Sequence, residues 1–276
     1  MRVGILHHPK IPDSLTLARE IGDWLRARKV GVWSGSSWEP ERIQRQLPNL
    51  DVLVALGGDG TLLRTARVAA SYEVPILGIN LGRLGFLAEV SVDEWEMRLA
   101  QMLRRDYRIE SRLMLMVETW RDSQMIEQRY EALNDVVVSR GSLARVVRIS
   151  TEVDSAYVTT YVADGLIVST ATGSTAYALA AGGPILPPEL RNILLLPIAP
   201  HLSLARPLVL DRGAVVTMHV RTDHAAILTV DGQFLIDLQD GDRVVVTSSP
   251  HLARFIRFHE PSHFYRTLME RLQWSA

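Results

Sequence analysis

A carboxylate within a glycine-rich turn is the first feature of this sequence that could do chemistry. Residues 56–61, Leu-Gly-Gly-Asp-Gly-Thr, follow the apolar run 52–56 directly and precede a helical pattern. Glycines let a phosphate approach the backbone closely, and the N-terminus of the following helix offers free N–H groups to an anion. A carboxylate at Asp59 would repel phosphate unless it accepts a proton from an attacking hydroxyl or holds Mg²⁺ against the phosphates. The pattern therefore favours phosphoryl transfer.

Two familiar nucleotide-binding patterns do not describe this turn. It lacks the lysine of the P-loop, and Leu63 stands where G-x-G-x-x-G requires its third glycine. A plain glycine turn in which Asp59 caps the next helix is the alternative interpretation. Arg64, one turn into that helix, could reach a phosphate, although a lone arginine there is more often solvated.

A second polar cluster occupies residues 164–177, where an apolar strand pattern runs into hydroxyl residues around Gly173. Hydroxyl and backbone N–H groups suit ribose and phosphate oxygens, and Tyr177 could stack on a flat ring. Serine and threonine turns that only cap a helix are the alternative. The pair Asn134-Asp135 can match the amino donor and ring nitrogens of adenine, but a hairpin turn would also explain it.

Composition excludes several other chemistries. The 276 residues contain no cysteine, which excludes disulfides, thiolate metal sites and cysteine nucleophiles. The net charge of -1 gives no basic field for nucleic acid or an anionic membrane. The longest apolar stretch, 193–199, is far shorter than the ~20 residues of a membrane span, and the N-terminus is too weakly apolar for a signal peptide. We expect a cytoplasmic protein that binds neither nucleic acid nor membrane. We also expect no protein-only metal site, because His7-His8 has no neighbouring acid pair and metal ligation needs several convergent groups.

The first hundred residues are expected to form an α/β domain. Strand patterns at 3–6, 30–33, 52–56 and 76–79 alternate with helical patterns around 17–25, 41–47, 62–70 and 91–103. Ser91 and Glu94 have the spacing of a capping box for the last of these helices. Alternation of this kind predicts a doubly wound parallel sheet, here over residues 1–106.

Strand patterns dominate from residue 107 onward, so residues 107–254 are expected to form a mostly-β domain of sandwich type. The pairs Asp231-Gly232 and Asp240-Gly241 predict tight turns between strands. The apolar spacing after Pro261 predicts a final helix, so that residues 255–276 or thereabouts rejoin the first domain. The expected strands are 112–120, 133–139, 146–153, 158–162, 166–169, 215–220, 227–230 and 244–247.

Taken together, these motifs resemble the NAD kinase family. The glycine-rich turn alone is shared with diacylglycerol, sphingosine and phosphofructokinase relatives, but the combination is specific. The resemblance implies a fold related to those proteins and transfer of a phosphoryl group, from ATP or another donor, to the 2′-hydroxyl of the adenosine ribose of NAD, giving NADP. The matching segments, in the family's order and spacing, are Gly57 to Thr61, Asn134-Asp135, Asp164 to Leu186, Pro200 to Pro207 and Asp231 to Gln233.

The resemblance also implies roles for single residues. Asp59 would be the general base or a metal-associated carboxylate, Asn134 and Asp135 would hold the adenosine, and Asp164 would bind toward the nicotinamide end. The phosphate-donor loop would be Gly57, Gly58, Gly60 and Thr61. The expected NAD-binding residues are Asp59, Gly60, Arg64, Phe86, Asn134, Asp135, Arg145, Val162, Asp164, Thr172, Thr175, Ala176, Tyr177, Ala178, Leu179, Ala180, Ala199 and Gln233.

Two positions depart from the family's pattern. Ala171 stands where proline is usual, and Val162 stands where many members carry lysine or arginine, which leaves the preference between NAD and NADH open. Arg145 is a candidate to compensate. The family implies a homodimer or homotetramer whose sites a neighbouring subunit completes, with Ala199 and His201 as candidate contacts. Mg²⁺ or another divalent cation is expected to be held mainly through the phosphates of ATP.

Two other functions remain open at this point. One is a related kinase that acts on a lipid or a sugar phosphate, and the other is a nucleotide sensor without turnover. The segment 172–177 and Asn134-Asp135 favour a dinucleotide over the first. Asp59 argues against the second, because a sensor needs no carboxylate at its phosphate loop.

Overall fold

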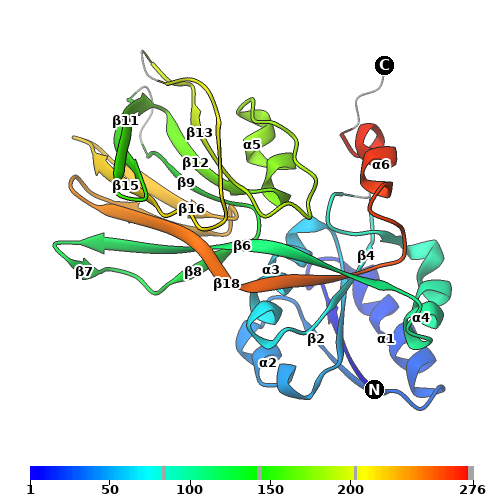
Figure 1. Ribbon diagram of the computed structural model, residues 1–276. Helices are drawn as coiled ribbons and strands as arrows, with labels where there is room; N and C mark the ends of the chain where they lie inside the picture. Colours follow the sequence, from blue (N-terminus) through cyan, green and yellow to red (C-terminus); the bar gives the residue numbers. More distant parts are fainter. Residues whose placement is uncertain (83–84, 142–144, 202–203, 273–276) are drawn as a thin grey trace. The chain divides into compact units, whose positions relative to one another are not determined.

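The computed structural model describes residues 1–82, 85–141, 145–201 and 204–272 (Figure 1). The chain divides into two compact units, Met1–Ser111 with Leu252–Ala276, and Arg112–His251. The expected changes of domain lie a few residues away, after 106 and after 254. The difference arises because two long strands, β6 (Arg108–Arg121) and β18 (Arg243–Arg257), contain both division points.

A parallel sheet forms the centre of the first unit. Its strands have the order β2-β1-β3-β4, β5 pairs with β4, and the end of β18 also pairs with β4 in parallel through Phe255 and Ile76. The predicted α/β fold is confirmed. The chain leaves β1 for β2 on one side and returns to β3 on the other, so the strand order switches between β1 and β3. The strands are β1 (Arg2–His7), β2 (Gly31–Ser36), β3 (Val52–Leu56), β4 (Ile76–Asn80) and β5 (Val90–Ser91).

Helices supply the apolar faces that cover this sheet. On α1, buried Leu17, Ile21 and Leu25 share one core with Ile5 and Val54 of the central strands. Burial of this stripe, rather than helix propensity alone, is what stabilises such a helix. The helices of the unit are α1 (Pro12–Arg26), α2 (Pro40–Gln44), α3 (Asp59–Ala69), α4 (Trp95–Leu103) and α6 (His263–Leu272), with short 3₁₀ turns at Leu47–Asn49, Ala70–Tyr72 and Val92–Glu94.

Only half of the predicted capping box at Ser91 and Glu94 is present. The backbone N–H and the hydroxyl of Ser91 both donate to the Glu94 carboxylate, the hydroxyl at 3.1 Å, but the serine oxygen caps no backbone N–H. A 3₁₀ turn occupies 92–94, and α4 begins only at Trp95. The box requires a backbone N–H of Glu94 for the serine oxygen, and the tighter turn removes that arrangement.

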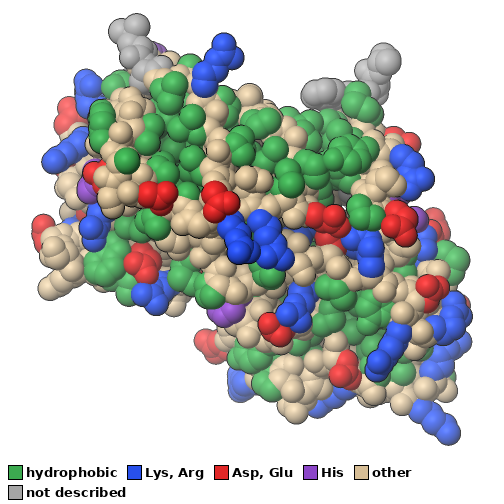
Figure 2. All heavy atoms as spheres, in the orientation of Figure 1, with side chains coloured by type: hydrophobic (Ala, Val, Ile, Leu, Met, Phe, Trp, Pro, Cys, Tyr) green, Lys and Arg blue, Asp and Glu red, His purple; other side chains and the backbone are tan. Residues whose placement is uncertain are grey.

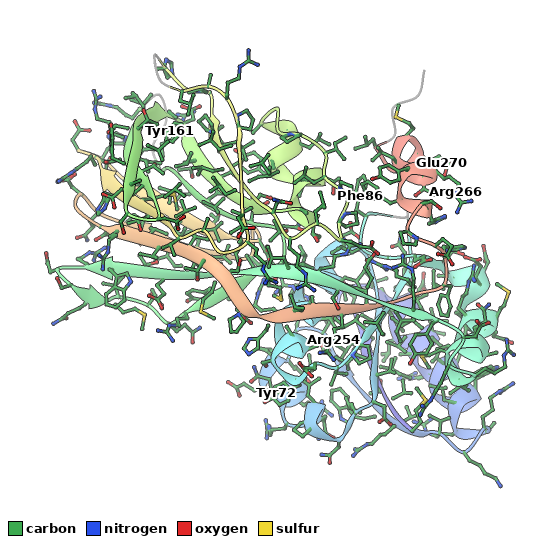
Figure 3. All side chains as sticks on the ribbon, viewed as in Figure 1. Tyr72, Phe86, Tyr161, Arg254, Arg266 and Glu270 are labelled. Atoms are coloured by element: carbon green, nitrogen blue, oxygen red, sulfur yellow. The ribbon has the colours of Figure 1, made fainter. Side chains whose placement is uncertain are left out.

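The second unit is a sandwich of two antiparallel sheets, as predicted. One sheet has the order β11-β10-β15-β18, with β6, β7 and β8 attached, and the other has the order β14-β13-β12-β9-β16-β17. Tyr161 (Figure 3) is fully buried in the core that both sheets share. A short 3₁₀ turn, η4 (Thr172–Thr175), and a one-turn helix, α5 (Tyr177–Ala180), follow β12. The remaining strands of the unit are β7 (Gln124–Met125), β8 (Tyr130–Ala132), β9 (Asp135–Arg140), β10 (Val147–Val153), β11 (Ala156–Ala163), β12 (Gly165–Thr170), β13 (Ile193–Ile198), β14 (Leu208–Leu210), β15 (Val216–Arg221), β16 (Ala226–Val230) and β17 (Phe234–Leu238).

Strand β13 is not among the predicted strands, and it contains Pro197, a residue that is unusual at an interior position of a sheet. The backbone groups of successive residues in a strand point to opposite neighbouring strands. Because the Ile198 carbonyl accepts from the Asp164 N–H on the β12 side, the nitrogen of Pro197 points toward β14. Strand β14 pairs only with residues 193–195 and stops short of that position.

Charge is mixed over the face shown in Figure 2, where Lys and Arg side chains lie among Asp and Glu. This agrees with the balanced totals of 30 basic and 31 acidic residues. Within the described residues, no helix is both long enough and apolar enough to cross a membrane.

Candidate active site

The glycine-rich turn forms as an open loop between β3 and α3. Gly57 has φ +152°, and a Cβ there would lie 2.4 Å from the Thr61 hydroxyl, so the turn requires glycine at this position. Gly58 and Gly60 are exposed, and a Cβ on either would meet no atom within 4 Å. The N-terminus of α3 therefore has open space in front of it, as an anion site needs.

The carboxylate of Asp59 is held by backbone donors from a distant segment. Phe86 N–H donates to Oδ2 at 2.8 Å, and Leu87 N–H donates to Oδ1 at 3.2 Å. A Cβ on Gly85 would lie 2.3–2.5 Å from the carboxylate atoms, so a bare backbone packs against them. The carboxylate is thus oriented by segment 85–87, which the simple helix-cap interpretation does not explain.

Two other predicted residues of this unit lie around the same loop. The Phe86 ring packs on Phe264 of α6 with centroids 6.4 Å apart, while its backbone serves Asp59 (Figure 3). Arg64 is half-buried on α3, and its guanidinium lies 5.2 Å from the ring centroid of Trp38. Asp59 and Phe86 are therefore brought together within the first unit, and Arg64 lies further along α3.

In the second unit, one carboxylate fixes the turn that carries Asn134 and Asp135. Asp231 accepts hydrogen bonds from the N–H groups of Leu133 (3.0 Å), Asn134 (2.8 Å) and Asp135 (3.2 Å). Asp231 and Gly232 have φ of +50° and +61° at the turn between β16 and β17, which confirms the tight turn predicted there. The hairpin turn therefore positions the Asn134-Asp135 pair.

Asp135 is a buried acid with altered protonation. It is 6% exposed, and its pKa is raised to about 7, first by burial and then by the negative charge of Asp231. Near neutral pH this carboxyl can therefore either donate or accept a proton.

Most hydroxyls of the 164–177 cluster bind the protein's own backbone. Thr170 donates to the Leu133 carbonyl at 2.6 Å and Ser169 to the Asn134 carbonyl at 3.1 Å. A Cβ on Gly173 would lie 2.2 Å from the Asn134 oxygen, so the two segments are in close contact. The turn chemistry that was the alternative interpretation is therefore present, and it serves to hold the Asn134 turn.

The remaining predicted residues, between 172 and 180, differ in their contacts and in their exposure to solvent. Thr175 donates to the Thr172 carbonyl at 3.2 Å, and Arg112 lies 3.5 Å from the Thr172 hydroxyl. Tyr177 is 47% exposed and free to meet a flat ring. Thr172 and Ala178 are buried, Ala178 in a small core cluster, whereas Ala180 is exposed, and Ala176 and Leu179 are half-buried.

Asp164 forms an ion pair with Arg140, at 3.0 Å. The sequence analysis does not name Arg140, and it names Arg145 only as a candidate to compensate for Val162. Arg145 is exposed, and its positive charge acts on Asp223. The signal for Arg140 was its position at the end of β9, whose antiparallel pairing sets Ser139 opposite Gly165.

The other predicted contacts are exposed or half-buried. Val162 is half-buried, and its carbonyl accepts from the His201 N–H at 2.7 Å. Ala199 is exposed with φ +44°, and the Gln233 N–H donates to the Val230 carbonyl at 2.9 Å. Leu202 and Ser203 of the expected 200–207 segment lie outside the described residues.

A resident metal does not fit the described side chains. In that part of the chain no three or more His, Asp or Glu residues converge as ligands. Asp59 could offer one carboxylate, but both its oxygens already accept backbone hydrogen bonds. We derive no catalytic step through a protein-held ion.

Comparison with known proteins extends over the whole chain. The family model for the ATP-NAD kinase N-terminal domain matches residues 27–107, and that for the ATP-NAD kinase C-terminal domain matches residues 133–258. A protein named NAD kinase from Chloroflexus aurantiacus is 43% identical over 274 residues, with 99% of each chain covered. One from Heliobacterium modesticaldum is 44% identical over 279 residues, with 98% of each chain covered.

Two solved structures share the fold. The structure of an NAD kinase from Archaeoglobus fulgidus in complex with ATP is 28% identical, with a TM-score of 0.78 and 100% of both chains covered. That of yeast NADH kinase complexed with NADH is 24% identical, with a TM-score of 0.83, and covers 100% of this chain and 88% of the yeast chain. With more than 40% identity to bacterial relatives over nearly its full length, the chain belongs to the NAD kinase family.

Proposed function

We propose that the protein transfers the terminal phosphoryl group of ATP to the 2′-hydroxyl of the adenosine ribose of NAD, giving NADP and ADP. The observation that carries this proposal is the Asp59 carboxylate, held by the N–H groups of Phe86 and Leu87 beside the open N-terminus of α3. A fixed carboxylate beside a phosphate-accepting loop suits proton removal during phosphoryl transfer. Membership of the NAD kinase family supports NAD as the acceptor.

The reaction needs both a nucleophile and charge neutralisation. As the ribose oxygen forms its bond to the terminal phosphorus, the hydroxyl proton passes to Asp59. The bond from that phosphorus to the bridging oxygen breaks, and the electron pair leaves with ADP. The N–H groups at the start of α3 offset the negative charge of the transferred group, and in-line placement supplies the rest.

The acceptor's adenosine would be held by Asn134 and Asp135, and its nicotinamide end by the region of Asp164. The fixed Asn134-Asp135 turn and the exposed ring of Tyr177 support a site for a flat base and its ribose.

The divalent cation would arrive with the donor. Mg²⁺ binds phosphate oxygens and water readily, so the complex of Mg²⁺ with ATP is the expected substrate. We also propose a cytoplasmic homodimer or homotetramer in which a neighbouring subunit contacts the site. The family resemblance and the exposure of Ala199 and His201 support this assembly.

A coupled assay tests the function. The protein is incubated with NAD, ATP and Mg²⁺, and an NADP-specific dehydrogenase reports the product. We expect NADP from the wild-type protein. ATP consumption that requires a lipid or sugar phosphate in place of NAD, or nucleotide binding without any turnover, would overturn the proposal.

Asp59→Asn tests the base. Because general-base help contributes ~10²–10⁴-fold, turnover should fall at least a hundredfold, while NAD binding measured by calorimetry stays unchanged. The control is Asp51→Asn, at the opposite end of β3, where the carboxylate accepts from the Arg2 N–H at 2.6 Å. Near-normal turnover of Asp59→Asn would place the base elsewhere.

A further inference from the structure

The ends of three parallel strands meet beside the phosphate loop. Leu6 pairs with Ala55 and His7 with Ser36, so β1, β2 and β3 end at the same level of the sheet. The segments that follow β1 and β3 lie on the two sides of the point where the strand order switches. Ligands of open α/β sheets bind at such a switch point.

Four side chains gather there into what we call the Trp38 cluster: His8, Lys10, Trp38 and Arg64. The Lys10 ammonium lies 4.7 Å from the centroid of the Trp38 ring, and the Arg64 guanidinium lies 5.2 Å from it. The His8 ring meets the same indole edge-to-face at 5.6 Å. Trp38 is 42% exposed, so this cluster is open to solvent.

The cations of the Trp38 cluster keep their charge unneutralised. Arg26 and Arg42, on nearby helices, pair with Asp23 and Glu39. For Lys10 and Arg64, no carboxylate partner is found in the described part of the chain. An aromatic ring orients a cation without cancelling its charge, so the N–H donors remain available to an anion.

Two further observations concern this edge of the sheet. The pKa of His8 is lowered, first by burial and then by the positive charges of Arg64, Lys10 and His7, so these charges lie near its ring. Ser37, only 4% exposed, has a buried hydroxyl that finds no hydrogen-bond partner among the described residues, and the same holds for Nδ1 of His7. Ser37 N–H donates to the His7 carbonyl, so both orphan atoms belong to the ends of β1 and β2. Buried polar atoms normally have a protein, water or ligand partner.

We propose that the Trp38 cluster binds the polyphosphate chain of the phosphoryl donor. Lys10 and Arg64 contact the phosphates behind the reacting one, and the reacting phosphate lies at residues 57–60. Trp38 is a positioning residue that holds the two cations toward the loop. This proposal rests on the proposed function, and it adds Lys10 and Trp38 to the binding site of the phosphoryl donor.

Steady-state kinetics with each substrate varied in turn test the proposal. Because a hydrogen bond to a charged group is worth ~1.5–3 kcal/mol, Lys10→Gln should raise KM for ATP about tenfold or more and change KM for NAD less than twofold. Trp38→Leu should raise KM for ATP about fivefold, and Trp38→Phe, which keeps a ring face, should restore most of it. The matched control is Arg28→Gln, because Arg28 lies 3.6 Å over Trp24 at the end of α1, another cation on an indole. An unchanged KM for ATP in Lys10→Gln, with active wild-type protein, would overturn the proposal and leave the function intact.

A second variant and a second ligand separate the possible causes. In Trp38→Leu, the further change Lys10→Gln should have a smaller effect than in the wild type, since Trp38 acts through Lys10. Inorganic tripolyphosphate should compete with ATP, and Lys10→Gln should weaken it by the same factor. If the variants weaken the binding of ATP but not that of tripolyphosphate, the cluster binds the base and not the phosphates, and the proposal is wrong. If the wild type makes no NADP, the proposed function fails, and calorimetry with tripolyphosphate still decides whether the cluster binds polyphosphate.

Discussion

Raising the pH from 5 to 7 should destabilise the protein through one buried carboxyl group, that of Asp135. Burial and the neighbouring charge of Asp231 raise its pKa to about 7, against 3.8 as its ordinary value. The folded protein therefore keeps a proton on Asp135 over a range in which the unfolded chain has lost it.

The sign and size of the effect follow from this difference. Between about pH 4 and 7 the folded state binds more protons at this site than the unfolded state, so the free energy of unfolding falls as the pH rises. One pH unit corresponds to ~1.4 kcal/mol, and the folded state is about half ionised at pH 7, so raising the pH from 5 to 7 should remove about 2 kcal/mol. Above about pH 8 the group is ionised in both states and its contribution is constant.

Urea unfolding of the wild type and Asp135→Asn at pH 5, 6, 7 and 8 measures the effect. The difference between the two proteins is compared across pH, so that all other titrating groups cancel. We expect the asparagine variant to gain about 2 kcal/mol on the wild type between pH 5 and 7, and only ~0.4 kcal/mol more at pH 8. A difference that stays constant with pH would refute the reasoning, because Asp135 would then titrate alike in both states.

Further predictions concern close contacts and metal. Gly85→Ala places a Cβ 2.3–2.5 Å from the carboxylate of Asp59 and should lower turnover at least tenfold in the coupled assay. The control Gly82→Ala, whose Cβ meets open space, should leave turnover unchanged. Equal turnover of the two variants would contradict this prediction. Gly173→Ala places a Cβ 2.2 Å from a backbone carbonyl oxygen and should cost ~1–3 kcal/mol in urea unfolding; unchanged stability would argue against that contact. Asp231→Ala removes the carboxylate that accepts from three backbone N–H groups, so the free energy of unfolding should fall by about 2–4 kcal/mol. The same variant should raise KM for NAD, and a wild-type KM would refute the positioning role of Asp231. Dialysis against a chelator without nucleotide should leave Tm unchanged, and an ion that survives it would contradict a donor-borne cation.

The sequence predicts the first unit's sheet well because central parallel strands are apolar on both faces. The run 52–56 is buried at every position, and it places the glycine turn directly at a strand end. The turn at Asp231-Gly232 was also predictable, since only a few residue types favour positive φ at both central positions. Strand β13 was missed because the accommodation of Pro197 depends on where β14 stops, which no local pattern contains.

The contacts made by the candidate site residues were harder to predict than the motifs that contain them. Asp59 is 27 residues from Phe86, and nothing in the intervening spacing indicates that backbone N–H groups would bind the carboxylate. The hydroxyls around Gly173 indicated a ligand by composition, yet Ser169 and Thr170 bind the 133–134 carbonyls. Such pairings depend on strand register, which is set by the whole sheet and not by neighbours in sequence.

The hydrogen bonds between Asp231 and the N–H groups of residues 133–135 join positions almost a hundred residues apart in the chain. These groups meet because β16 pairs with β9, which places the Asp231 hairpin turn beside residues 133–135. Closure of so long a loop is a late and cooperative event in folding. A chain in which these strands have not paired therefore lacks the Asp231 contacts, and the shape of the 133–135 turn depends on completion of this part of the sandwich.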